Sequence, residues 1–271
     1  MNNHIGFIGG GNMAQAIIAG LLNNSREGIK ISAADPSSTC REALIKKGVS
    51  AYAENDPVMA NADLIVLAVK PQVLTALLAT LRPLVRPKHV FVSIAAGTSL
   101  ATLRHGLGDT PQPIVRVMPN TPALIGLGMA VMVSDRPMEN SIQTEVTELF
   151  EACGRTLWIS SEETIDAVTA VSGSGPAYFF LMIESMVATA IKLGLSVEDA
   201  RLLVAQTAKG AAAMVEESDV GPDVLRQRVT SPGGTTEAAL EIFESAGFAG
   251  LIDRALIAAR ERAVQLSKEL C

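Results

Sequence analysis

A glycine-rich segment near the N-terminus constrains the fold of this chain more than any other feature. Residues 5–14 read IGFIGGGNMA, a short apolar strand followed by the start of an apolar helix. Between them, Gly9, Gly11 and Ala14 fill the pattern G-x-G-x-x-A. Such glycines permit a tight turn and a close approach of backbone to a pyrophosphate, and the small third residue lets helix pack on strand. The segment predicts dinucleotide binding; the alternative is a glycine-rich turn that binds nothing.

The length and composition of the chain narrow its class. With 271 residues the chain is long enough for two domains, and 48% hydrophobic with 18% charged residues is typical of a globular protein. The net charge of −6 argues against a nucleic-acid partner or an anionic membrane surface. Every run of about 18 residues is broken by charges, glycines or prolines, so we expect no membrane span.

The cysteines and histidines give no sign of a metal site. Cys40, Cys153 and Cys271 are odd in number, far apart and outside any C-x-x-C pattern, as expected for a reducing compartment. The three histidines lack metal-ligand spacing. From the spacing of the cysteines and histidines we expect no bound metal. Because the chain begins directly with a strand, we expect no targeting segment and therefore a cytoplasmic protein.

Strands and helices alternate through the first 160 residues. The run LIVLAV at residues 64–69 has no polar member, as expected for a strand buried on both faces of a parallel sheet. The other expected strands are residues 5–8, 29–34, 49–52, 90–96, 114–118, 129–133 and 156–159. This alternation predicts an α/β fold, with a Rossmann doubly wound sheet over residues 1–160.

The chain changes character after about residue 160. The expected helices are residues 164–171, 177–193, 196–217, 223–229, 235–245 and 248–266, and no convincing strand follows residue 159. We therefore predict an all-helical domain over residues 161–271. Several of these helices are apolar on more than one face, which requires burial against a partner. We expect a homodimer formed through this domain.

The loops that follow the strands are where a Rossmann sheet binds its ligand. Three of them, residues 68–71, 93–97 and 118–122, contain small residues that let backbone approach a flat ring, and prolines that fix the turns. The alternative for each loop is ordinary strand-to-helix punctuation. Lys70 is as well explained by a solvated lysine at the edge of the sheet as by a cofactor contact.

Two loops stand out in the helical domain. Residues 172–176, SGSGP, and residues 231–237, SPGGTTE, each lead into a helix. Exposed amides at a helix N-terminus, with the hydroxyls of Thr235 and Thr236, form a suitable seat for a carboxylate. The alternative is a pair of well-capped helices without a ligand.

Six segments together, in their order and spacing, resemble the pyrroline-5-carboxylate reductase family: FIGGGNMA, AVKP, SIAAG, MPNTP, AVSGSGPAY and SPGGTTEAAL. The resemblance covers essentially the whole chain, and its last two segments are the discriminating ones. Related dehydrogenases of hydroxyacids place a catalytic lysine on the helix after a comparable glycine motif. Here that helix begins PAYFF and its first lysine is Lys192, which disfavours an alcohol oxidation.

The resemblance implies NAD(P)H-dependent reduction of L-1-pyrroline-5-carboxylate to L-proline, the last step of proline biosynthesis. A protonated cyclic imine is already electrophilic, so the site must supply positioning, a carboxylate clamp and a donor near the ring nitrogen. Thr236 is the implied catalytic residue. The implied substrate-binding residues are Ser231, Gly234, Thr235, Thr236, Ser174 and Glu162. Glu163, beside Glu162, leaves that carry-over ambiguous.

The same resemblance implies the cofactor-binding residues. They are Ile8, Gly9, Gly10, Gly11, Asn12, Met13, Asp35, Ser37, Asn55, Ala68, Val69, Lys70, Pro71, Ile94, Ala95 and Ala96. An acid in the place of Asp35 commonly binds a ribose hydroxyl and favours NAD. Ser37, Ser38, Thr39 and Arg41 are able to bind a 2′-phosphate if Asp35 turns away. The family preference implies NADP, with NAD as the alternative.

Three points stay open from the sequence. The resemblance alone implies a ring of five dimers. Arg228 stands where relatives often carry asparagine, and its role is open. The competing functions are reduction of another small cyclic imine or ketone, and a dinucleotide sensor without catalysis; the intact SPGGTT loop argues against the sensor.

Overall fold

The computed structural model describes residues 4–23, 28–108 and 110–269, and it contains two compact units. The first unit is the chain up to Ser174 together with the chain from Ala259 onward, and the second is Gly175–Ala258. Each unit is described here by itself. The boundary expected between residues 160 and 161 stays a prediction.

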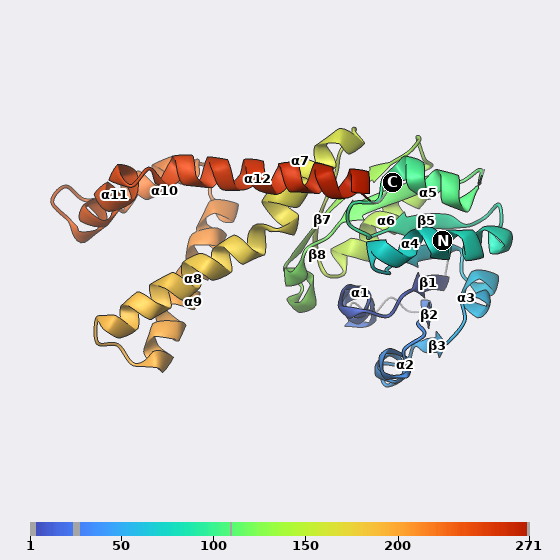
Figure 1. Cartoon of the computed structure of the whole chain (residues 1–271). Helices are drawn as coiled ribbons and strands as arrows, with labels where there is room; N and C mark the ends of the chain where they lie inside the picture. Colours follow the sequence, from blue (N-terminus) through green and yellow to red (C-terminus); the bar gives the residue numbers. More distant parts are fainter. Residues whose placement is uncertain (1–3, 24–27, 109, 270–271) are drawn as a thin grey trace. The chain divides into compact units, whose positions relative to one another are not determined.

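A single sheet organises the first unit (Figure 1), in the order β3-β2-β1-β4-β5-β6-β7-β8. Its strands are β1 (His4–Ile8), β2 (Lys30–Ala34), β3 (Ser50–Tyr52), β4 (Leu64–Leu67), β5 (Val90–Ser93), β6 (Ile114–Met118), β7 (Gly128–Ser134) and β8 (Gly154–Trp158). Strands β1 to β6 pair in parallel, β6 and β7 pair antiparallel, and β7 and β8 pair in parallel. The predicted Rossmann sheet is confirmed, with its last two strands reversed.

The strand order changes direction between β1 and β4. Strands β2 and β3 extend the sheet on one side of β1, and β4 to β6 extend it on the other. The carboxyl ends of β1 and β4 therefore flank a topological switch point, where open α/β sheets bind their ligands. The fold places the glycine-rich turn after β1 at this point.

Helices connect the strands of the first unit. They are α1 (Asn12–Asn23), α2 (Ser38–Ile45), α3 (Asp56–Asn61), α4 (Pro71–Leu81), η1 (Arg82–Leu84), α5 (Leu100–Leu107), η2 (Thr121–Ile125), α6 (Asn140–Glu151), η3 (Glu162–Thr164), α7 (Ile165–Val168) and η4 (Thr169–Gly173). Helix α3 was not expected from the sequence, because its six residues are too few to show a helical period. The segment η4 is a π-helix, a form frequently found at functional sites.

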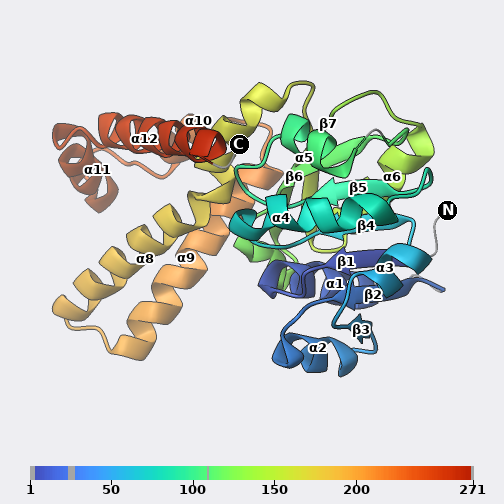
Figure 2. The same ribbon diagram turned by 45° about the vertical axis from the view of Figure 1, so that its right-hand side comes forward.

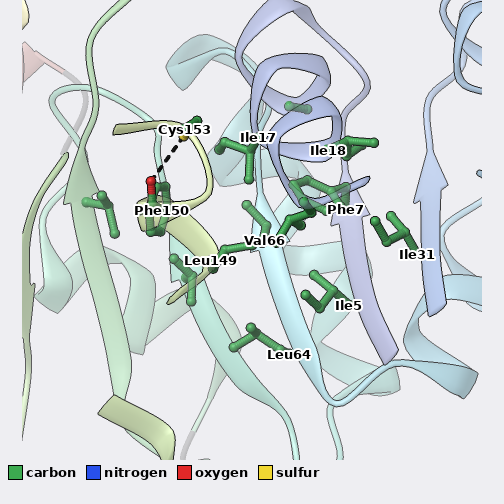
Figure 3. Close-up of a cluster of buried hydrophobic side chains, with 14 of the residues drawn as sticks. Ile5, Phe7, Ile17, Ile18, Ile31, Leu64, Val66, Leu149, Phe150 and Cys153 are labelled. Carbon is green, nitrogen blue, oxygen red and sulfur yellow. Dashed lines mark hydrogen bonds between the residues drawn. The ribbon is translucent and has the colours of Figure 1, made fainter. Parts of the chain in front are cut away.

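Two apolar cores cover the two faces of the sheet. Figure 3 shows part of the first core, where Ile17 and Ile18 of α1 lie against strand residues such as Phe7, and Phe150 comes from α6. The second core packs α3, α4 and α5 on the opposite face. Burial of each large apolar side chain contributes roughly 1.5–3 kcal/mol to the stability of the fold. The two cores therefore hold the sheet, and with it the ends of its strands, in place.

The second unit consists of helices, and no described residue after Trp158 lies in a strand, which confirms the all-helical prediction. Its helices are α8 (Gly175–Lys192), α9 (Val197–Glu217), α10 (Pro222–Arg228), α11 (Thr235–Ser245) and the first half of α12 (Phe248–Glu269). Helices α8 and α9 lie side by side (Figure 2).

Helix α8 exposes much of its apolar surface within a single chain. Phe179, Phe180 and Leu181 are 69%, 61% and 64% exposed. By length and composition alone, the helical stretch Glu162–Lys192 could cross a membrane, and little of it is buried in the chain. An exposed apolar surface of this size is typical of an interaction face.

Candidate functional site

The turn after β1 has the geometry that a dinucleotide-binding turn requires. Gly9 has a φ of +101°, and a Cβ built on it would lie 2.6 Å from the carbonyl oxygen of Ala68. The Gly9 amide donates to the Ala34 oxygen at 2.8 Å, which ties the turn to β2. Only glycine fits here, because the left-handed backbone and the close approach to Ala68 both exclude a side chain.

The second glycine of the pattern faces open space. No atom lies within 4 Å of a Cβ built on Gly11, and α1 begins at the next residue, Asn12. The first amides of a helix have no intrahelical acceptor and attract anions. Ala14 is buried where α1 meets the sheet. The residues present therefore fit a dinucleotide whose pyrophosphate lies at the start of α1.

Asp35, at the end of β2, is turned toward the glycine-rich turn. Its Oδ2 accepts a hydrogen bond from the Gly10 amide at 2.7 Å, and its Oδ1 accepts one from the Ser37 amide at 2.8 Å. The Arg41 guanidinium donates to the Asp35 and Pro36 carbonyl oxygens at 2.8 Å. Both the acid and the arginine thus hold the turn between β2 and α2.

The remaining residues predicted for the adenosine half begin short helices. Ser37 is the N-cap of α2, and its hydroxyl accepts from the Cys40 amide at 3.4 Å. Asn55 stands before α3 without a side-chain cap bond. Both lie near the carboxyl ends of β2 and β3, at the same edge of the sheet as the glycine-rich turn.

The fold brings two further predicted loops to that edge. Residues 68–71 follow β4, with Lys70 exposed and Pro71 as the first residue of α4, and residues 94–96 follow β5. Because β1, β4 and β5 are parallel neighbours, their carboxyl ends meet. The structure brings these predicted cofactor residues together; their binding roles stay predictions.

The loop after β6 is joined to the π-helix η4. Asn120 Nδ2 donates to the Ser172 carbonyl oxygen at 3.2 Å, and Asn120 Oδ1 accepts from the Met129 amide at 2.8 Å. Ser174, a predicted substrate residue, follows η4, and its amide donates to the Thr169 oxygen at 2.8 Å. The predicted MPNTP and SGSGP segments are therefore in direct contact.

Glu162, a second predicted substrate residue, is engaged inside the first unit. Its Oε1 lies 2.7 Å from Arg116 NH1 and accepts from the Leu100 amide at 2.8 Å. The neighbouring Glu163 is exposed. The prediction omitted Arg116, although a charged residue inside the strand IVRVM was a signal that could have identified it. The substrate role of Glu162 stays a prediction.

In the second unit, the loop before α11 presents backbone amides. Gly233 has a φ of +72°, its amide donates to Glu237 Oε2 at 2.6 Å, and the Gly234 amide donates to the Ser231 oxygen at 2.9 Å. Helix α11 begins at Thr235. The first amides of this helix lack intrahelical acceptors, as a carboxylate site requires, and the roles of Thr235 and Thr236 stay predictions.

Arg228 precedes the loop that leads into α11, and its role stays open. Arg228 is the exposed last residue of α10, where the helix dipole stabilises a positive charge.

Burial raises the pKa of the Cys153 thiol to about 11 and lowers the pKa of His89. Among the residues that the structure describes, no cluster of three His, Cys, Asp or Glu side chains could hold a metal ion. The absence of a metal stays a prediction.

Comparison with known proteins agrees with this geometry. Residues 162–266 match a family model described as pyrroline-5-carboxylate reductase dimerisation, and residues 4–97 match one described as NADP oxidoreductase, coenzyme F420-dependent. The pyrroline-5-carboxylate reductase of Pseudomonas aeruginosa is 44% identical over 98% of this chain and 97% of its own length. That of Glycine max is 36% identical over 97% and 96%.

Solved structures show the same likeness. A pyrroline-5-carboxylate reductase from Coxiella burnetii superimposes with a TM-score of 0.90 at 37% identity, covering 98% of both chains. The pyrroline carboxylate reductase of Plasmodium falciparum, solved with NADP bound, has a TM-score of 0.86 at 32% identity and covers 97% of this chain and 98% of its own. The match to a dimerisation domain supports a homo-oligomer.

Proposed function

This chain belongs to the pyrroline-5-carboxylate reductase family, and from that premise we propose how its own residues carry out the reaction. It is an oxidoreductase that uses NADP and reduces L-1-pyrroline-5-carboxylate to L-proline in proline biosynthesis. When bound, the reduced cofactor supplies the hydride. The protein must bind and orient both reactants, and supply a proton at the ring nitrogen.

The cofactor is held along the switch-point edge of the sheet. Residues 8–13 receive the pyrophosphate at the start of α1, since Gly11 leaves open space there. Residues 68–71 and 94–96 line the nicotinamide half. Asn55, with Asp35 and Ser37, lies toward the adenosine half.

The substrate carboxylate binds at the start of α11. The first amides of α11, with Ser231, Gly234 and Thr235, satisfy the carboxylate oxygens at the positive end of the helix dipole. Thr236 Oγ1 donates to the imine nitrogen and passes it a proton, directly or through water, while the hydroxyl takes a replacement proton from solvent. Ser174, in the SGSGP segment, is a further proposed substrate-binding residue. The observation that supports this assignment is the left-handed backbone of Gly233, φ +72°, just before α11 begins at Thr235.

The carboxylate seat and the hydroxyl donor can be tested separately by steady-state kinetics with NADPH. Thr236→Ala should lower kcat by about a hundredfold, as for loss of a general acid, while Thr236→Ser retains most of the activity. Thr80→Ala is the matched control, because the exposed Thr80 hydroxyl bonds only its own helix, at 2.7 Å to the Leu77 oxygen. A pyrroline without the carboxylate should show a strongly raised KM.

Two results would overturn the assignment. Full activity of Thr236→Ala removes Thr236 from the reaction. Equal KM values for the substrate with and without its carboxylate remove the seat at α11. Preference for another cyclic imine or ketone, or cofactor binding without hydride transfer, would instead support one of the competing functions.

Asp35 bears on the choice between NADP and NAD. Its carboxylate oxygens already accept from the Gly10 and Ser37 amides, so the acid is held back on the glycine-rich turn. The hydroxyls of Ser37, Ser38 and Thr39 at the start of α2 then supply donors for a 2′-phosphate. We propose NADP as the working cofactor, with NAD accepted less well.

The assembly and compartment follow from the apolar helices and from the family. We propose a homodimer through the helical domain, because α8 exposes Phe179, Phe180 and Leu181 in the single chain. A ring of five dimers is the proposed larger assembly. We further propose a cytoplasmic enzyme without nucleic-acid or membrane partners.

A further inference from the structure

One carboxylate oxygen joins three segments that are far apart in the sequence. Glu162 Oε1, at the start of η3, accepts from Arg116 NH1 on β6 at 2.7 Å and from the amide of Leu100 on α5 at 2.8 Å. All three residues belong to the first unit. The carboxylate thus connects the sheet, the start of α5 and the segment that leads into the helical domain.

Forming the Arg116–Glu162 ion pair removes both charges largely from water, which costs desolvation free energy. The Arg116 side chain is only 7% exposed and that of Glu162 is 29% exposed. A buried ion pair is weak evidence for stability, because apolar residues of similar volume often serve as well. What an apolar pair cannot do is accept the Leu100 amide, which begins α5 and has no intrahelical acceptor.

The Leu100 amide matters because α5 follows directly on the loop after β5. The start of that loop is fixed by the Ile94 amide, which donates to the Leu67 oxygen at 3.1 Å. Its end is fixed at α5, where the Ser99 hydroxyl accepts from the Thr102 amide at 3.1 Å and Glu162 accepts from Leu100. Release of this end would let residues 94–99 move.

We propose that Glu162 is a positioning residue for the nicotinamide half of the cofactor, acting through the start of α5 and the loop of residues 94–99. This inference rests on the proposed role of residues 94–96 in holding the nicotinamide. Arg116 pairs with the Glu162 carboxylate and holds it beside the Leu100 amide. In this role Glu162 acts through the Leu100 amide, and the substrate contact that the resemblance implies is a separate prediction.

Three variants separate positioning from mere charge balance, with the NADP⁺ dissociation constant measured by calorimetry as the main readout. Glu162→Leu removes the acceptor and should weaken NADP⁺ binding by about tenfold or more, as small displacements at a site do. Glu162→Gln keeps an acceptor oxygen and should recover most of the affinity. The double variant Glu162→Leu/Arg116→Met removes the unpaired charge, so thermal stability should recover while affinity stays low.

The matched control is another largely buried ion pair, one whose arginine lies on α5. Arg104 Nε donates to Asp135 Oδ2 at 2.8 Å, near the opposite end of the helix. Asp135→Asn should lower Tm and leave the dissociation constant for NADP⁺ unchanged. Wild-type affinity in the double variant, or an equal loss of affinity in Asp135→Asn, would overturn the proposal.

Binding and turnover answer different questions here. If the wild type binds NADP⁺ but does not reduce pyrroline-5-carboxylate, the proposed function fails while the binding comparison still tests Glu162. If turnover is normal and Glu162→Leu binds NADP⁺ as the wild type does, only the positioning role fails. In Glu162→Leu, the KM for NADPH should rise more than the KM for the imine substrate.

Discussion

Gly173 lies so close to Met118 that a Cβ on the glycine would come within 2.3 Å of the methionine Cε. Met118 ends β6, and Gly173 ends the π-helix η4. The carboxyl end of β6 and the SGSGP segment are therefore packed against each other, and the present position of Met118 leaves no space for a side chain on Gly173.

Gly173→Ala should destabilise the fold through this contact. The methionine is flexible and can yield, so we expect a loss of about 1–3 kcal/mol in the free energy of unfolding, as for overpacked sites. Chemical denaturation measures it. The double variant Gly173→Ala/Met118→Ala should recover part of the loss, because the two positions are coupled. Additive losses would show that the contact is not the cause.

Asn120→Asp tests the hydrogen bond beside that contact. The carboxylate keeps the acceptor for the Met129 amide but loses the donor to the Ser172 oxygen, so we expect a loss of about 1–3 kcal/mol. Asn61→Asp is the matched control, since the Asn61 side chain is exposed and donates only to the Pro57 oxygen at 2.7 Å. An equal effect in both variants would contradict the role given to Asn120.

Asp35→Asn should change cofactor preference. Removal of the negative charge reduces repulsion of a 2′-phosphate and weakens any bond to a ribose hydroxyl. The ratio of kcat/KM for NADPH to that for NADH should therefore rise, even though loss of one carboxylate acceptor loosens the turn at Gly10. Kinetics with both cofactors measure the ratio. A fall in the ratio would show that Asp35 supports NADP binding directly.

Acid should destabilise the first unit through the partly buried His4 and the buried His89. Burial lowers the pKa of His89, and burial with Lys30 nearby lowers the pKa of His4. Unfolded histidine takes up a proton near pH 6.5, whereas the folded groups resist it, so the unfolded state binds more protons below that pH. The free energy of unfolding should fall as pH drops below 6.5.

His89→Asn isolates one of these two groups. Asparagine retains an acceptor for the Arg86 amide, which donates to His89 Nδ1 at 3.1 Å, but cannot take up a proton. Denaturation at pH 7 and pH 5 should show a smaller pH-dependent loss in the variant than in the wild type. An unchanged dependence would assign the effect to other groups.

The sequence predicted most of the helices and strands of both units because the signals for them are local. The run LIVL of β4 is buried throughout, and α11 begins and ends where the pattern places it. The reversal of β7 was missed because strand direction depends on pairing across the sheet. Helix α3 is too short to show a period.

In the candidate site too, local features could be predicted from the sequence and long-range contacts could not. Glycine patterns and turns identify backbone geometry, so Gly9, Gly11 and the loop before α11 could be recognised directly. The contacts of Glu162 with Leu100 and of Asp35 with Gly10 could not, because Leu100 and Gly10 contribute only backbone amides, which no residue pattern marks. Long-range contacts of this kind need the folded chain.

The most direct test of the account is the stoichiometry of the reaction. Purified protein is mixed with pyrroline-5-carboxylate and NADPH, and NADPH oxidation is followed by absorbance while proline is quantified by mass spectrometry. The account predicts one proline formed for each NADPH oxidised, with turnover strongly reduced in Thr236→Ala. NADPH that binds without being oxidised, or oxidation without proline, would contradict it.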